Sequence, residues 1–191
     1  MISTLANIYR HSAFTSSELE TIFKAHKKSF FKKGDMFLKK GQLANEYYCL
    51  ESGLVRSFAI NTEGNEITTG FFGKDEIVIE VASLFLRIPT KENILALTDC
   101  ECWKIDFDSF QTLFQTVNGF MEWGRAWMSG VLFTTKQRYL SMITDSATER
   151  YLALQKQHPE IIQNTPLKHI ASYLGITDTS LSRIRKEVSR L

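Results

Sequence analysis

The side chains with the clearest potential for chemistry lie close to the C-terminus. Hydroxyl groups come first and cationic groups follow within a few residues: Thr179, Ser180, Ser182, Arg183, Arg185 and Lys186. Hydroxyl and guanidinium donors of this kind bind base edges in the major groove and the phosphate oxygens beside it. Residues 165–191 carry five Lys or Arg against two acidic residues, so their charge of +3 exceeds the +2 of the whole chain. This stretch is therefore predicted to bind nucleic acid.

Two short helices joined by a tight turn must position these groups. Apolar residues recur at helical spacing in both: Leu167, Ile170, Ala171, Leu174, Leu181, Ile184 and Val188. Gly175 stands where the first helix must stop in a left-handed conformation, and Ile176 is expected to be the buried residue of the turn. Thr165 is placed to cap the first helix, with Pro166 opening it, and Thr177 to cap the second. The pattern predicts a helix-turn-helix; a plain helical hairpin with a solvated basic face is the alternative.

Composition places the chain among globular proteins. Of the 191 residues, 43% are hydrophobic and 23% are charged, a balance that argues against disorder. No apolar run approaches the ~20 residues of a membrane span, and no basic segment followed by an apolar run opens the chain. Cys49, Cys100 and Cys102 are an odd number without a disulfide pattern. We therefore expect buried thiols, no metal site and a location in the reducing cytoplasm.

Residues 29–106 change from helical to strand periodicity. Short apolar runs are separated by turn residues: 30–31, 36–38, 47–50, 54–60, 66–72, 77–81, 94–97 and 102–105. Short strands at this spacing predict an antiparallel sandwich or β-roll, with a hairpin tip at 61–65.

A long proline-free helix is predicted over residues 119–144, and it is apolar on more than one face. One row is Phe120, Gly124, Trp127 and Val131, and another is Met121, Met128, Leu132, Thr135 and Tyr139. A helix with two apolar faces must be covered on both. We expect the roll to cover one face and the same helix of a second chain to cover the other, giving a symmetric dimer. Burial of the helix within a single chain is the alternative.

Two capping boxes, Ser17 with Glu20 and Ser146 with Glu149, mark the starts of further helices. The first helix is expected to run to about Lys28. Because no glycine- or serine-rich linker interrupts the chain, three semi-rigidly joined segments are predicted. They are a β-roll over 1–118, a dimerisation helix over 119–145 and a helix-turn-helix domain over 146–191.

A small β-roll, a long helix and a C-terminal helix-turn-helix, in that order, resemble the Crp/Fnr superfamily of bacterial transcription regulators. The match covers nearly the whole chain and is most specific over SATERYLAL and HPEIIQNTPLKHIASYLGITDTSLSRIRK, which looks like the branch common in Bacteroidetes-type bacteria. The resemblance implies an α+β fold whose roll is a double-stranded β-helix of the cyclic-nucleotide-binding-domain type. It also implies a cytoplasmic homodimer on double-stranded DNA, at a palindromic operator with half-sites about 34 Å apart, and RNA polymerase as a candidate partner.

The resemblance assigns roles to particular residues. Family members contact bases through early positions of the last helix and a later arginine, which here are Asp178, Thr179 and Arg183. Residues suited to phosphate contacts are Thr177, Ser180, Lys186, Lys168, His169 and Arg185. The dimer interface is expected at Phe120, Trp127, Met128, Val131, Leu132 and Thr135. Relatives often carry glutamate in place of Thr179, and the cyclic-AMP receptor protein carries arginine in place of Asp178, so a different operator sequence is expected. The β-wing of many relatives is not expected after Leu191.

The effector site departs from the family pattern. Members that bind cyclic nucleotides use a Gly-Glu pair for the ribose and an Arg-Ser or Arg-Thr pair for the cyclic phosphate. Here the first pair reads Ile-Glu, ending at Glu80, and the second falls in residues 89–93, which makes Glu80, Thr90 and Lys91 the expected pocket residues. Lys91 offers a point charge instead of an arginine fork, and Glu92 would repel the phosphate. Cyclic AMP or cyclic GMP is therefore not expected to bind in the usual mode, and the cysteines do not match the iron–sulfur variant of the family.

Two other classes of function are alternatives. A β-roll enzyme of the cupin type would need histidines on its inner strands, but all four histidines lie outside the predicted roll: His11, His26, His158 and His169. No nucleophile–base pairing or glycine-rich phosphate loop stands out, so a non-enzyme is predicted. The second alternative is a ligand-sensing or protein-interaction module whose helical tail docks a protein partner. Salt dependence separates it from DNA binding.

Overall fold

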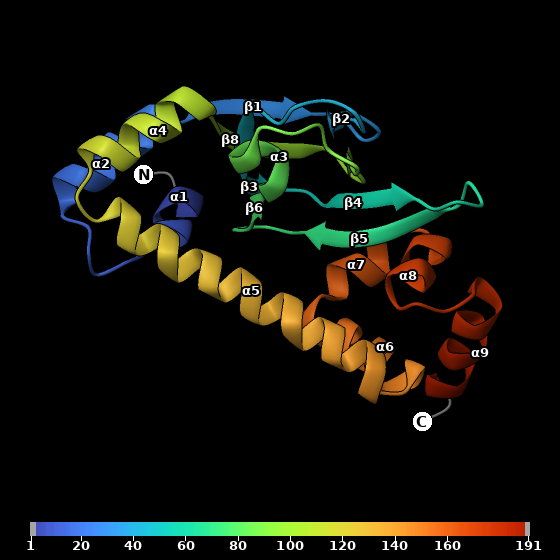
Figure 1. Cartoon of the computed structure of the whole chain (residues 1–191). Coiled ribbons are helices and arrows are strands. Elements are labelled where there is room, and N and C mark those ends of the chain that lie inside the picture. The colour runs from blue at the N-terminus through green and yellow to red at the C-terminus, as the bar shows by residue number, and fades with distance from the viewer. Residues whose placement is uncertain (1–2, 190–191) are drawn as a thin grey trace.

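The structure is a computed structural model of the chain and describes residues 3–189. A β-roll, one long helix and a bundle of short helices follow one another along the chain (Figure 1). The helices are α1 (Ser3–Ile8), α2 (Ser16–Ala25), α3 (Val81–Leu86), α4 (Phe107–Thr116), α5 (Phe120–Thr144), α6 (Ala147–Gln157), α7 (Pro159–Asn164), α8 (Leu167–Tyr173) and α9 (Asp178–Val188). The strands are β1 (Lys27–Phe31), β2 (Met36–Leu38), β3 (Glu46–Ser52), β4 (Val55–Ile60), β5 (Glu66–Phe72), β6 (Ile77–Val78), β7 (Asn93–Ala96) and β8 (Cys100–Asp106). Arg190 and Leu191 of the predicted basic tail lie outside the described residues.

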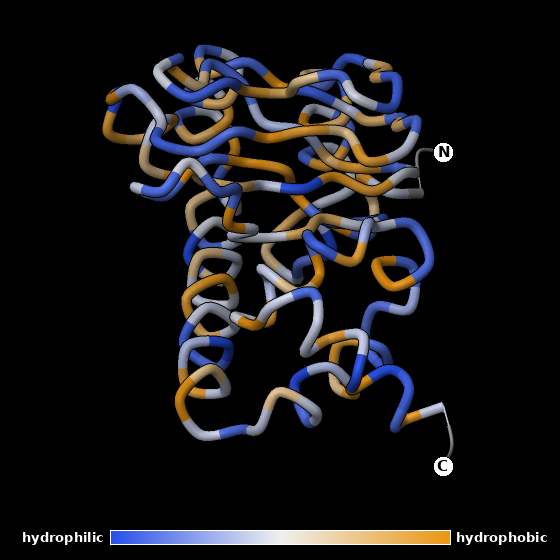
Figure 2. Tube along the Cα trace, turned by 90° about the vertical axis from the view of Figure 1, so that its right-hand side faces the viewer, coloured by the Kyte–Doolittle hydropathy of each residue, from blue (hydrophilic) through white to orange (hydrophobic). Residues whose placement is uncertain are grey.

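The roll consists of two four-stranded antiparallel sheets, with strand orders β1-β8-β3-β6 and β2-β7-β4-β5. Side chains that point between the sheets are fully buried, among them Leu50, Val55, Val78 and Ile105. Figure 2 shows the hydrophobic segments recurring along the strands of this layered part. The predicted fold class, an α+β chain with an N-terminal double-stranded β-helix and a helical C-terminal region, is confirmed.

The β4–β5 hairpin closes at the predicted tip. The amide of Asn61 donates to the carbonyl of Asn65 at 3.0 Å, and the Asn61 side-chain oxygen accepts from the amides of Glu63 and Asn65. Asparagine favours such turns because its short side chain can bond to nearby backbone. β5 is the edge strand of its sheet, so its outer backbone groups must find partners outside the sheet.

The predicted strand over 77–81 is wrong beyond Val78. The chain leaves the sheet there, and the Glu80 carboxylate caps α3 by accepting from the amide of Ser83. The run of six residues in α3 is too short and too apolar to be told from a strand by its periodicity. This correction matters because it places Glu80 at the mouth of the roll.

The first capping box also lies elsewhere than predicted. Thr15, not Ser17, caps α2, and its hydroxyl accepts from the amide of Glu18 while the Glu18 carboxylate accepts from the amide of Thr15. The helix ends at Ala25 instead of continuing to Lys28, because β1 begins at Lys27 and pairs with β8.

The long helix α5 runs from the roll to the helical tail and lies beneath the roll in the view of Figure 1. Its first turns belong to the core of the roll: Phe120 is fully buried, and Trp123 packs against Tyr9 with ring centroids 4.6 Å apart. Within residues 3–189, none of the helices combines the length and apolar character needed to cross a bilayer.

The tail helices α6–α9 have a hydrophobic core of their own. Its buried members are Tyr151, Leu154, Ile161, Ile170, Ala171, Leu174, Leu181 and Ile184, joined by Leu54 and Leu97 of the roll. The predicted capping box of Ser146 and Glu149 opens α6, as expected. Pro159 does more than end that helix, since it opens the separate helix α7. Ile176 is only half-buried in the turn, although it packs against this core.

Candidate nucleic-acid interface and ligand pocket

The second helix of the predicted motif, α9, has one buried apolar side and one exposed polar side. Leu181 is fully buried and Ile184 nearly so, while the Thr177 hydroxyl accepts from the amide of Ser180 at 3.2 Å, as predicted for the cap. Most of the residues that were predicted to contact bases or phosphates are exposed. They are Thr177, Asp178, Thr179, Arg183, Arg185 and Lys186 at α9, and Lys168 on α8. Ser180 is half-buried. The helix therefore presents a continuous row of hydroxyls and cations to solvent.

The turn between the two helices follows the prediction at Gly175 but not at Thr165. Gly175 has φ of +69°, the left-handed conformation expected at this position. Thr165 instead ends α7, its hydroxyl is buried without a hydrogen-bond partner, and Pro166 occupies the cap of α8 without a side-chain bond. Arg150 of α6 donates to the carbonyl of Leu174 and so satisfies the end of α8.

The first helix of the motif, α8, lies against the edge strand β5. The Thr68 hydroxyl donates to the carbonyl of His169 at 3.0 Å and lies 2.8 Å from the Ser172 hydroxyl. The Thr68 amide, which faces away from its own sheet, donates to the Ser172 hydroxyl at 3.2 Å. Helix α8 thus covers the open edge of the sheet and satisfies one of its amides.

His169 is not available to phosphate, which corrects the prediction. Only 9% of the residue is exposed, with Nε2 3.5 Å from Nη1 of Arg56 and Nδ1 3.9 Å from the Glu66 carboxylate. Arg56 is itself fully buried and donates to the Thr68 hydroxyl and to Glu66. Burial, followed by the adjacent Arg56 cation, lowers the pKa of His169, with Glu66 opposing the effect. The imidazole therefore belongs to the contact between tail and roll.

Arg138 ties α5 to the same contact. Its guanidinium donates to the carbonyl of Thr69 on β5 and stacks on the Tyr173 ring of α8, with 4.0 Å from the carbon of the guanidinium to the ring centroid. Tyr173 in turn packs on Phe71, with centroids 5.0 Å apart. Roll, long helix and tail therefore meet around the hairpin strand β5.

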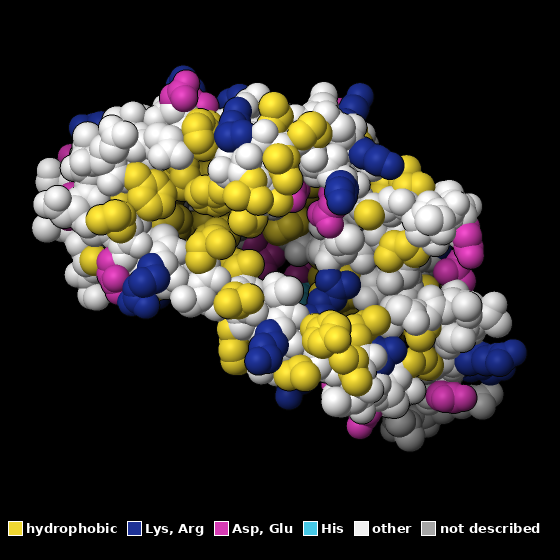
Figure 3. Space-filling model, viewed as in Figure 1, with side chains coloured by type: hydrophobic (Ala, Val, Ile, Leu, Met, Phe, Trp, Pro, Cys, Tyr) yellow, Lys and Arg dark blue, Asp and Glu magenta, His cyan; other side chains and the backbone are white. Residues whose placement is uncertain are grey.

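One apolar row of α5 is packed on the roll and the other is exposed to solvent. The residues predicted for the dimer interface lie in both rows. In the row that contains Phe120, the side chains face the roll: Phe120 is fully buried and Trp127 packs against the core. Phe120 is thus removed from the predicted interface. The other row is open, with exposed fractions of 64% at Met121, 40% at Met128, 70% at Leu132 and 65% at Tyr139. Figure 3 shows hydrophobic side chains gathered along α5 on this face of the molecule.

The roll contains a cavity of about 400 Å³ near the start of α3. Its lining comes from β2, β3, β6, β7 and the loop before β3: Phe37, Leu38, Gln42, Leu43, Ala44, Asn45, Glu46, Tyr48, Val78, Ile79, Glu80 and Ile94. Of the three predicted pocket residues, only Glu80 lines it. Thr90 is buried and its hydroxyl accepts from the amide of Glu92 at 3.0 Å, while Lys91 is exposed. Sequence reasoning missed the remaining residues, because they face one another only after the sheets close.

The three thiols are free and buried in the roll. Burial raises the pKa of Cys102 to about 12, so this thiol is protonated at neutral pH. Across residues 3–189 no group of three or more His, Cys, Asp or Glu is arranged to hold a metal ion.

Known proteins share this architecture. Residues 28–117 match the family model of the cyclic nucleotide-binding domain. The CRP-like protein Clp of Xanthomonas campestris pv. campestris is 34% identical over 93 residues, which cover 48% of this chain and 40% of Clp. Two solved structures share the fold: CLP of Xanthomonas campestris (TM-score 0.71, 21% identity, 92% of each chain) and FixK2 of Bradyrhizobium japonicum (TM-score 0.72, 16% identity, 86% of this chain and 85% of that one). The match to Clp spans less than half of either chain, so the comparisons show a cyclic nucleotide-binding-type domain within a chain that shares the fold of CLP and FixK2.

The name of the matched domain implies a cyclic nucleotide in the roll, and the pocket residues do not fit one. A cyclic phosphate needs a cation or several donors, yet none of the residues that line the cavity, all within the described part of the chain, is Lys or Arg. Arg87, just outside, is engaged by the carbonyl of Ala44 and the side chain of Asn45. The charged side chains that line the cavity are Glu46, which is paired with Lys104, and Glu80, whose carboxylate would repel an anion.

Proposed function

We propose that this chain is a sequence-specific, DNA-binding transcription regulator that acts as a homodimer. The observation that carries the proposal is the two-sided character of α9. Its apolar side is buried on α8 and its polar side, rich in hydroxyls and cations, faces solvent at the far end of the molecule from the roll. This is the arrangement that a recognition helix needs in order to enter a major groove.

Within α9, the base contacts are assigned to Asp178, Thr179 and Arg183. All three are exposed, and Arg183 lies one to two turns into the helix, where a bidentate bond to guanine is feasible. Phosphate contacts fall to the flanking side chains Thr177, Ser180, Lys168, Arg185 and Lys186. His169 is left out because Arg56 and Glu66 surround it.

The exposed row of α5 supplies the dimer interface, centred on Met128, Leu132 and Thr135. Large apolar side chains that are 40% to 70% exposed on one helix are typical of a surface that a partner covers. A second copy of α5 is the partner proposed, since it offers the same row in a two-fold arrangement. The roll over 1–118, the helix over 119–145 and the tail over 146–191 would then serve as sensor, dimerisation and DNA-binding segments, with RNA polymerase as a candidate partner.

Selection of bound duplexes from a random pool by the full chain tests the DNA-binding proposal. We expect enrichment of a palindrome whose half-sites are one helical turn apart, with affinity that falls steeply as salt rises. A chain that enriches no sequence in dilute buffer, or one whose tail binds a protein partner with little response to salt, would contradict it.

The dimer is tested by sedimentation equilibrium of Leu132→Asp. A carboxylate in the centre of an apolar interface should weaken dimerisation by at least about tenfold, since burying an unpaired charge is costly. Leu152→Asp is the matched control, because Leu152 is an exposed leucine (41%) on α6, away from the row. Equal self-association of the two variants would rule out the α5 interface.

A further inference from the structure

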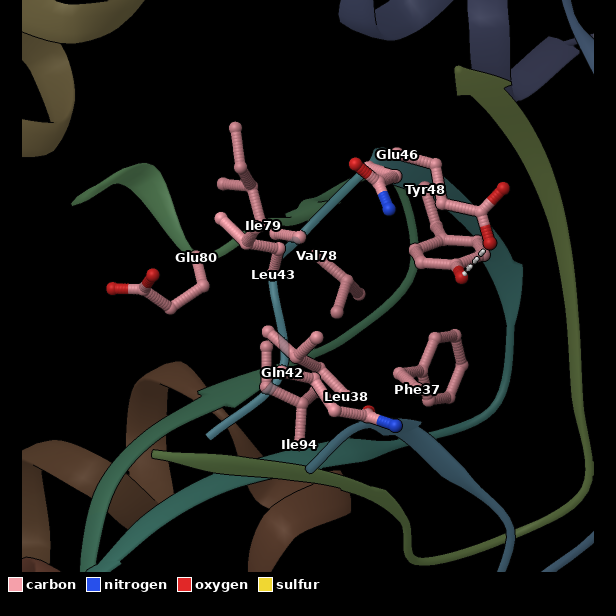
Figure 4. Close-up of a pocket in the computed structure, with 12 residues that line it drawn as sticks. Phe37, Leu38, Gln42, Leu43, Glu46, Tyr48, Val78, Ile79, Glu80 and Ile94 are labelled. Carbon is pink, nitrogen blue, oxygen red and sulfur yellow. Dashed lines mark hydrogen bonds between the residues drawn. The ribbon is translucent and has the colours of Figure 1, made fainter. Parts of the chain in front are cut away.

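The cavity of the roll has an apolar middle between two polar ends. Phe37, Leu38, Val78 and Ile94 surround the middle, with Leu43 over it (Figure 4). At one end Glu46 and Tyr48 lie side by side, and at the other Glu80 extends away from the apolar group. A volume of about 400 Å³ is within the range of sites that hold small organic ligands.

The two carboxylates differ in how far they are neutralised. Glu46 accepts from the Tyr48 hydroxyl at 2.5 Å and forms an ion pair with Lys104 at 2.8 Å, so its charge is balanced. Glu80 accepts only from the amide of Ser83, through one of its oxygens. Within the described residues Glu80 forms no ion pair, so its charge is offset by the Ser83 amide at the start of α3 and by no cation.

A second carboxylate, that of Glu92, lies near Glu80 but outside the residues that line the cavity. Glu92, just before β7, has a raised pKa because it is mostly buried and because the Glu80 charge acts on it, while Thr69 and Arg138 partly offset the shift. The residues that replace the arginine pair of cyclic-nucleotide sites do not supply a cation here. Thr90 is buried and turned toward the backbone of Glu92, and Lys91 is exposed outside the cavity.

We propose that this cavity binds an organic ligand with an apolar body and a cationic end, the cation lying against Glu80, and that it rejects phosphodiester anions. The apolar body is held by burial in the middle of the cavity, at roughly 25 cal/mol per Å² of apolar surface removed from water. The charge selects the ligand because a cation restores the balance at Glu80 while an anion adds to the repulsion. This proposal concerns the roll alone and does not depend on the tail binding DNA.

Three probes of equal chain length test it: octylamine, octanol and octanoate, which are cationic, neutral and anionic at neutral pH. Binding to the full chain, without DNA, is followed by methyl NMR, because Val78 and Ile94 line the cavity and report occupancy there directly. We expect octylamine to bind at least about tenfold more tightly than octanoate, with octanol between them. Cyclic AMP, cyclic GMP and cyclic di-GMP should leave these methyl signals unchanged.

Two variants locate the effect. Glu80→Gln keeps a side-chain oxygen for the Ser83 amide. It should bring the affinities for octylamine and octanoate within about threefold of each other and leave the affinity for octanol unchanged. Glu20→Gln, on the exposed surface of α2, is the matched control and should keep the tenfold preference. Leu43→Trp should fill the cavity and abolish binding of all three probes, whereas Leu86→Trp, on an exposed leucine outside the lining, should not.

Several results would overturn the proposal. These are a preference for octanoate or for any cyclic nucleotide, an amine preference that survives Glu80→Gln, or no binding by all three probes. Any of them would leave the DNA-binding proposal standing, because operator selection is measured separately.

Discussion

The two helices of the motif, α8 with 7 residues and α9 with 11, have different relations to solvent. Helix α8 turns the His169 carbonyl and the Ser172 hydroxyl toward the edge strand β5, where both bond to Thr68, while Lys168 stays exposed. Helix α9 keeps most of its polar groups outward, while Leu181 and Ile184 are buried in the core and Val188 packs against it. One helix is therefore held by polar contacts, and the other offers its polar contacts to a partner.

The difference shows how the orientation of α9 is fixed. Arg56, wholly buried under α8, bonds to Thr68 and Glu66 and forms a polar base on which α8 rests. Within the described residues the Arg56 Nε and Nη1 atoms have hydrogen-bond partners and the buried Nη2 has none, so the contact favours one docking angle through the directed bonds that Nε and Nη1 make. Through α8, the roll can set the direction in which α9 faces.

The largest expected effect comes from removing the centre of the α8 contact. Thr68→Val keeps the shape of the side chain but leaves the Arg56 Nε without a partner, while the Ser172 hydroxyl still donates to the His169 carbonyl and accepts from the amide of residue 68. We expect a loss of about 3 kcal/mol in the free energy of unfolding, because leaving a buried charged group unsatisfied lies at the upper end of the cost of about 1–3 kcal/mol. Urea denaturation measures it. Thr62→Val, at the exposed hairpin tip, should change stability by less than about 0.5 kcal/mol, and similar losses in both variants would refute the contact.

On the other helix, Arg183→Ala should affect binding and not folding. Loss of a bidentate base contact should reduce discrimination between the selected operator and random DNA by about 2 kcal/mol, roughly 30-fold. The unfolding free energy should stay within about 0.5 kcal/mol, because the side chain is exposed. Competition binding with the two DNAs gives the ratio, and an unchanged ratio would remove Arg183 from the base contacts.

Acid should lower the stability of the fold through its two buried histidines, His26 and His169. Burial lowers the pKa of His26 from 6.5 to about 4, and His169 is shifted in the same direction by burial and by Arg56. A depressed histidine pKa means that the unfolded chain binds more protons, so stability is complete above pH 6.5 and falls as pH drops toward the folded pKa. From its shift of 6.5 to about 4, His26 should account for a loss of about 1.5 kcal/mol at about pH 5.5.

Single substitutions separate the contributions of His26 and His169 to the loss of stability in acid. The groups that act on His169 are Arg56 and Glu66 from the hairpin, with Lys168 and Asp178 from the tail. His169→Gln should reduce the loss of stability between about pH 7.5 and 5.5 by a smaller amount than His26→Gln does. Denaturation curves across this range measure both, and a wild-type stability that rises on acidification would contradict the direction of the shift.

The smallest effect is expected from Lys186→Ala. In the proposed interface this exposed cation contacts phosphate alone, so its loss should weaken binding to operator and random DNA alike, by about threefold, and reduce the salt slope by about 1. The operator-to-random affinity ratio distinguishes this variant from Arg183→Ala, which should lower the ratio while Lys186→Ala leaves it unchanged. If the two variants changed the operator-to-random ratio equally, base and phosphate roles on α9 could not be told apart.

Local patterns in the sequence were enough to predict the elements whose partners are near in the chain. The Ser146–Glu149 box, the cap at Thr177 and the two rows of α5 all depend on residues three to seven positions apart. The apolar rows predicted that two faces of α5 are covered but not which one faces the roll, because Phe120 and Trp127 were expected in the dimer interface and pack on the core of the roll instead.

Features formed by distant residues could not be predicted in this way. His169 was expected at the surface because its partner, Arg56, is 113 residues away and nothing in the local pattern pairs them. The cavity residues come from separate strands whose inward faces meet only in the closed roll. Thr90 and Lys91 were placed in the cavity by counting along the chain, and the course of α3 and the loop after it moved them out.

The most direct test of the central claim measures binding of the full chain to two versions of its selected operator. In one the half-sites are one helical turn apart, and in the other about five added base pairs turn one half-site to the opposite face of the duplex. If α9 is presented twice by a dimer joined through α5, the insertion should lower affinity at least about 100-fold. Equal affinity for the two duplexes would contradict the account.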